Sequence, residues 1–116
     1  MPVEMTRERF EELVSDALDL IPRKFTAAMS NIVVLVEDIH PDNDHLLGLY
    51  HGVALTERTS HYAGVLPDMI TIYRIPILRM CWSEADVVRQ VGITVIHEVG
   101  HHFGIDDETL HDLGWG

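Results

Sequence analysis

The sequence predicts an α+β fold in which a small β-sheet packs against one long helix, preceded by an N-terminal helix. Apolar residues recur at helical spacing in two segments, one near each end of the chain. Between them lie three short apolar runs, which are typical of strands. A chain of 116 residues is large enough for one real core but not for two, so we expect a single domain over residues 1–116.

The N-terminal segment is expected to be a helix that begins after Thr6, a residue able to cap it. Its apolar residues follow helical spacing: Phe10, Leu13, Val14, Ala17, Leu18 and Ile21. Pro22 ends this helix or opens a second short helical piece over residues 23–29. Residues 31–37 are then predicted to form a buried strand, followed by a loop rich in Asp, Asn and Pro over residues 38–44.

A second strand is predicted over residues 46–55, with Gly48 and Gly52 as points of bulging or close approach. Residues 56–67 are polar and are expected to form a loop. A third strand is predicted over residues 69–75, and Pro76 directly after it favours an edge position or a strand end.

The long helix is expected to begin at Ser83, where Ser83–Glu84–Ala85–Asp86 is similar to a capping box. It should continue to about residue 102 or 103, because valines recur at every fourth position and predict a mostly buried face. Residues 107–113 can add a last helical turn or two.

The end of this helix carries the chemistry-bearing residues. His97 and His101 lie four positions apart, so both imidazoles face the same side of a helix and can reach one metal ion. Glu98 projects beside that face, where it can reach a water on the metal. This H-E-x-x-H pattern would arise by chance in roughly 4% of shuffles of so His-rich a chain.

The pattern extends further, to H-E-x-x-H-x-x-G-x-x-D, which lowers the chance rate to roughly 2 in 10,000. Gly104 can adopt the left-handed conformation that ends a helix and turns the chain. The turn would let Asp107 reach back to the metal as a third ligand. Asp107 could instead cap the last helix, in which case Asp106 or His111 would supply that ligand.

The composition excludes several classes of partner. A formal net charge of −11 with scattered basic residues argues against nucleic acid and anionic membranes. No apolar run approaches the length of a membrane helix, and the N-terminus has no apolar secretory region. One cysteine, Cys81, fits a reducing compartment, so we expect a cytoplasmic protein.

On these residues the chain resembles the zincin metallopeptidases, and among them a minimal, single-domain bacterial group. Two further stretches, residues 46–52 and 66–74, are similar to that group. The resemblance implies a small mixed sheet against the active-site helix, Zn²⁺ held by His97, His101 and Asp107, and Glu98 as the general base. Asp107 replaces the His that is usual in metzincins, and no Met follows it, so a Met-turn cannot lie downstream.

The function expected from the sequence is therefore zinc-dependent hydrolysis of peptide or protein substrates by a metal-activated water. We expect an extended substrate to pair with a free sheet edge, for which residues 69–75 are the choice. Tyr50, His51 or Tyr73 could stabilise the oxyanion. Two alternatives are open: a non-catalytic metal-binding domain that acts through a protein partner, and a structural metal closed by a fourth ligand such as His111 or Asp112.

Overall fold

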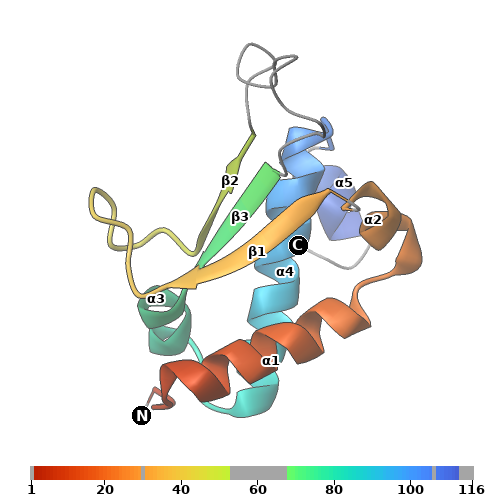
Figure 1. Ribbon diagram of the computed structural model, residues 1–116. Helices are drawn as coiled ribbons and strands as arrows, with labels where there is room; N and C mark the ends of the chain where they lie inside the picture. Colours follow the sequence, from red (N-terminus) through yellow and green to blue (C-terminus); the bar gives the residue numbers. More distant parts are fainter. Residues whose placement is uncertain (1, 30, 53–67, 106, 113–116) are drawn as a thin grey trace.

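The structure is a computed structural model that describes residues 2–29, 31–52, 68–105 and 107–112. In it, a β-sheet packs against two helices that also pack on each other (Figure 1). Helix α4 packs against strands β2 and β3 and also against α1, which crosses it. In chain order the elements are α1 (Arg7–Leu20), α2 (Arg23–Ala28), β1 (Ile32–Glu37), β2 (Gly48–His51), β3 (Asp68–Tyr73), α3 (Arg74–Arg79), α4 (Glu84–His102) and α5 (Asp107–Asp112).

The sheet is mixed, with the strand order β1-β3-β2. Strand β1 is parallel to β3 and pairs Ile32 with Asp68, whereas β2 is antiparallel to β3 and pairs Tyr50 with Ile70. The α+β fold with a small mixed sheet against the long helix is thus confirmed. Of the two alternatives that Pro76 favours, the edge position is wrong, because β3 is the central strand and pairs on both sides, and the strand end is confirmed.

Pro76 explains that error. It lies in the first turn of α3, a short helix that follows β3 without a gap and that the sequence does not predict. A helix tolerates proline in its first turn because the N–H groups there have no partner within the helix. Pro76 therefore marks the start of a helix, and the predicted strand ends at Tyr73.

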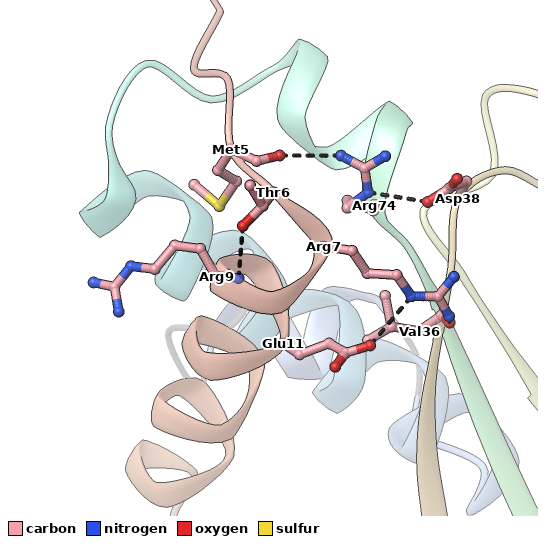
Figure 2. Close-up of polar contacts among 8 residues, drawn as sticks. All are labelled: Met5, Thr6, Arg7, Arg9, Glu11, Val36, Asp38 and Arg74. Atoms are coloured by element: carbon pink, nitrogen blue, oxygen red, sulfur yellow. Dashed lines mark hydrogen bonds and ion pairs between the residues drawn. The ribbon is translucent and has the colours of Figure 1, made fainter.

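The two main helices begin at the predicted caps. The Thr6 hydroxyl accepts a hydrogen bond from the Arg9 N–H at 3.2 Å (Figure 2), and the Ser83 hydroxyl accepts one from the Asp86 N–H at 3.1 Å. Each bond satisfies one N–H that the first helical turn leaves without a partner. Because both caps hold, α1 and α4 start as the sequence predicts.

The core lies where α1, α4 and the sheet meet. The valine stripe of α4 is buried, and it packs with α1 and with Ile70 and Ile72 of β3, both fully buried. The buried apolar residues of α1 and α4 are Phe10, Leu13, Val14, Ala17, Val87, Val91, Val95, Ile96 and Val99. Because this face of α4 is buried, functional side chains can project only from the rest of the helix surface.

Polar contacts join the start of α1 to the end of the sheet where β1 and β3 terminate (Figure 2). The Arg7 guanidinium donates to the carbonyl of Val36 and to Glu11. Arg74 donates to the Asp38 carboxylate at 3.0 Å and to the carbonyl of Met5 at 3.2 Å. No helix within the described ranges is long and apolar enough for a membrane crossing.

Candidate metal centre and active site

His97 and His101 lie in the last two turns of α4 with their rings side by side. The ring centroids are 5.7 Å apart and the ring planes are nearly perpendicular, at 87°. His97 is half-buried and His101 is exposed. Two imidazoles on one tetrahedral zinc, with Zn–N bonds of about 2.0–2.1 Å, have centres about 5 Å apart. The separation of the pair in α4 is within about 1 Å of this value.

Gly104 ends α4 as the sequence predicts. Its φ of +81° lies in the left-handed region that glycine adopts without strain. The Ile105 N–H donates to the Gly100 carbonyl at 2.7 Å, and the Gly104 N–H donates to the His101 carbonyl at 3.1 Å. These two bonds form a Schellman motif, which stops the helix and reverses the chain. The reversal brings α5 back against α4.

The third ligand belongs to the segment after that reversal. Helix α5 begins at Asp107, but the side chain of Asp107 and the whole of Asp106 lie outside the described residues. His111 and Asp112 are exposed on α5. Among the residues that the structure describes, no group of three His, Cys, Asp or Glu side chains could hold a metal ion. Coordination by Asp107 therefore stays a prediction.

Glu98 is half-buried beside the imidazole pair, and strand β2 holds its carboxylate. The main-chain N–H of Tyr50 donates to Oε1 of Glu98 at 3.1 Å. The two residues are far apart in the sequence, and the packing of α4 on β2 brings them together. One carboxylate oxygen of Glu98 is thus engaged by the sheet, and the carboxylate has further acceptor capacity.

The Tyr50 side chain lies between β3 and the end of α4. Its hydroxyl donates to Oδ2 of Asp68 at 2.6 Å, and its ring stacks on the His102 ring with centroids 4.1 Å apart. The sequence did not single out Asp68. No motif marks it, because its contact with Tyr50 depends on the pairing of two strands joined by a long connection.

The other two residues proposed for the oxyanion lie elsewhere. Tyr73 is buried at the opposite end of β3, and burial, with Glu37 nearby, raises the pKa of its phenol. His51 follows Tyr50 in β2, and successive side chains of a strand point to opposite faces. Because the Tyr50 ring faces α4, His51 projects from the other face of the sheet. Of the three residues, Tyr50 is the one that contacts Glu98, and the oxyanion role stays a prediction.

A cavity of about 410 Å³ lies directly beside the two motif residues His97 and Glu98. Its walls come from α4 and from the chain that enters β2. The lining residues are Asn43, His45, Leu46, Leu47, Gly48, Gln90, Ile93, Thr94, His97 and Glu98. A second cavity of about 510 Å³ lies between α1 and α4 and contains no motif residue. Of these two cavities, the first is the one from which a ligand can reach Glu98.

Comparisons with known proteins bear on the family and the fold. A family model described as "Zincin-like metallopeptidase" matches residues 29–115. No curated protein matches the chain. Among solved structures, the chain is similar to a conserved hypothetical protein from T. thermophilus, with 24% identity and a TM-score of 0.56. That match covers 93% of this chain and 99% of the other, and it shows the fold alone.

Proposed function

Because the chain belongs to the zincin-like metallopeptidase family, we propose that it hydrolyses peptide bonds in a zinc-dependent reaction. His97, His101 and Asp107 hold the zinc ion in this proposal. Glu98 is the general base. Bound zinc supplies the Lewis acid that polarises the scissile carbonyl and brings the pKa of the attacking water towards neutrality.

One observation carries the proposal: Glu98 lies beside the imidazole pair with one carboxylate oxygen held by the Tyr50 N–H at 3.1 Å. A held carboxylate next to two coordinating imidazoles is the arrangement that a general base needs, because proton transfer requires a fixed short distance to water. Glu98 takes the proton of the attacking water and then delivers it to the leaving amine.

The edge of β2 supports an extended peptide as the substrate. Among the described strands, β2 pairs only with β3, so its other edge faces away from the sheet. A peptide can add to such an edge through main-chain hydrogen bonds, and pockets beside the edge then select side chains. The 410 Å³ cavity adjoins β2 at Gly48 and has apolar walls at Leu46 and Ile93. An apolar substrate side chain would fit beside the base.

The second candidate is a metal-binding domain that acts through a protein partner. The observation that favours it is the mostly apolar 510 Å³ cavity between α1 and α4, which is separate from the motif. Leu20, at its rim, is 69% exposed. A partner could place apolar side chains there without using Glu98. Binding without hydrolysis would favour this candidate.

Zinc content is the first experiment. Protein purified without chelator should hold close to one zinc per chain, measured by elemental analysis, and His97→Ala and His101→Ala should each lower that content strongly. Less than about 0.1 zinc per chain in the wild type, even after zinc addition, would refute the metal centre.

Glu98→Gln separates the chemistry from the metal. This variant should keep its zinc and lose hydrolysis of a mixed peptide library, read out by mass spectrometry of the products. Glu84→Gln makes the same change near the other end of α4 on an exposed residue, and it should leave hydrolysis unchanged. Equal activity of the Glu98→Gln variant and the wild type would remove Glu98 as the base.

A further inference from the structure

We propose that Tyr50 is the positioning residue for Glu98, and that Asp68 and His102 fix Tyr50 in that role. The inference rests on the proposed function of Glu98 as the base. Three contacts of Tyr50 carry it: the main-chain N–H on Glu98 at 3.1 Å, the hydroxyl on Asp68 at 2.6 Å, and the ring on His102 at 4.1 Å.

The pairing of β2 with β3 directs the Tyr50 N–H towards Glu98. In an antiparallel pair, hydrogen bonds to the partner strand come from alternate residues, and the residues between them direct their N–H and C=O groups outwards. The Leu47 carbonyl accepts the Tyr73 N–H at 2.9 Å, which sets Leu47, Leu49 and His51 as the residues bonded to β3. Tyr50 therefore directs its N–H away from β3, and Glu98 accepts it there.

The Tyr50 side chain is fixed from two sides. The short bond to Asp68 ties the phenol to the start of the central strand β3. The nearly parallel ring of His102, inclined by 17°, ties it to the last turn of α4. Glu98 and His102 are one helical turn apart, so Tyr50 contacts two successive turns of the same helix, with its main chain on one and its ring on the other.

The partners of these contacts define the role of Tyr50. The Tyr50 hydroxyl already donates to Asp68, so the phenol acts on the strand and not on the substrate. By holding Oε1, the Tyr50 N–H restricts the rotamers of Glu98 and leaves the second oxygen for the water. Loosening this hold should lower kcat while KM and zinc content stay unchanged, because the metal ligands do not change and a peptide on β2 would pair with outward main-chain groups other than the Tyr50 N–H, which Glu98 occupies.

Hydrogen exchange of the backbone amides, followed by NMR without any substrate, tests the hold directly. The Tyr50 amide should be protected in the wild type and should exchange about tenfold faster in Glu98→Ala, because a hydrogen bond to a charged acceptor is lost. The amides of Leu49 and His51, which bond to β3, are the internal controls and should not change. Unchanged exchange of the Tyr50 amide in Glu98→Ala would overturn the proposal.

Tyr50→Phe tests how the side chain is held, because it removes the hydroxyl that donates to Asp68 and keeps the ring and the N–H. Exchange at position 50 should accelerate, and kcat for a cleaved peptide should fall about tenfold with KM and zinc content unchanged. Asp68→Asn should act in the same direction. Tyr73→Phe is the matched control, since it removes a hydroxyl from the far end of β3, and it should change neither readout.

The outcomes separate this inference from the proposed function. If the wild type cleaves no peptide but exchange at position 50 still depends on Glu98 and on the Tyr50 hydroxyl, the peptidase proposal fails and the hold on Glu98 stands. If peptides are cleaved and Tyr50→Phe behaves as Tyr73→Phe does in both readouts, the positioning role is overturned and the peptidase proposal stands.

Discussion

Gly48 is the position where the packing of β2 on α4 can be tested most sharply. A Cβ added there would lie 2.6 Å from Cγ2 of Thr94 and 3.3 Å from the carbonyl oxygen of Thr71. Carbon atoms pack best at about 3.5–4.0 Å, so Gly48→Ala forces β2 and α4 apart by about 1 Å. Overpacking of this kind costs about 1–3 kcal/mol. At roughly 4 °C per kcal/mol for a domain of this size, Tm should fall by about 4–12 °C.

A double-mutant cycle assigns the cost to the Thr94 methyl. Thr94→Ser removes Cγ2 but keeps the hydroxyl that accepts from Gln90 at 3.3 Å. Alone it should cost about 0.5–1.5 kcal/mol, and in the double variant it should restore part of the stability lost in Gly48→Ala, with a coupling of about 1 kcal/mol or more. Urea unfolding followed by circular dichroism measures all four proteins.

Gly52→Ala is the control, because Gly52 is on the same face of the same chain segment. There the nearest atom, Cε1 of His102, would lie at 3.7 Å, which is ordinary contact. This variant should stay within about 0.5 kcal/mol of the wild type. Equal unfolding midpoints for Gly48→Ala and Gly52→Ala, or no coupling with Thr94→Ser, would refute the close approach of β2 and α4.

Three further predictions concern charge and capping. Burial, with Asp86 nearby, raises the pKa of the Cys81 thiol. The free energy of unfolding should therefore be at its full value below about pH 8.5, the ordinary thiol pKa, and should decline as pH rises above it. A Cys81→Ala variant should show a shallower decline in denaturant midpoint between about pH 7 and 10. The hydrogen bond from Arg9 lowers the pKa of Glu84. The small stability difference between the wild type and Glu84→Gln should therefore be present at about pH 7 and disappear as pH falls through that lowered pKa. High salt should reduce the same difference. Ser83→Ala should cost about 1 kcal/mol in thermal unfolding, because the Asp86 N–H loses its cap.

The parts of the fold that depend on local patterns could be predicted from the sequence. The caps Thr6 and Ser83, the valine stripe of α4 and the turn at Gly104 are all local signals, and the structure has each of them. Helix α3 could not be separated from the preceding strand. Its apolar residues continue those of β3, and Pro76 is compatible with both a strand end and a helix start.

In the candidate site, too, only the features that depend on local patterns could be predicted from the sequence. The spacing of His97 and His101 is enough to place two imidazoles on one helical face, and their rings lie side by side. The contacts of Tyr50 with Glu98 and Asp68 depend on strand order, which single-sequence periodicity does not contain. Pro76 makes the sequence favour an edge at the third strand, whereas the edge beside Glu98 belongs to β2.

The central place of β3 has a consequence for how the molecule assembles. Both other strands pair with β3, and each pairing must close a long stretch of chain, which makes such sheets slow to form. The imidazole pair needs only the local winding of α4, which is fast. We therefore expect a folding chain to bring His97 and His101 onto one helix face before β2 arrives to hold Glu98. Pulse-labelled exchange during refolding should record early protection in α4 and late protection at Tyr50; simultaneous protection would contradict this order. Under the proposed function, the chain would then be able to bind zinc before it could use the ion, on every refolding.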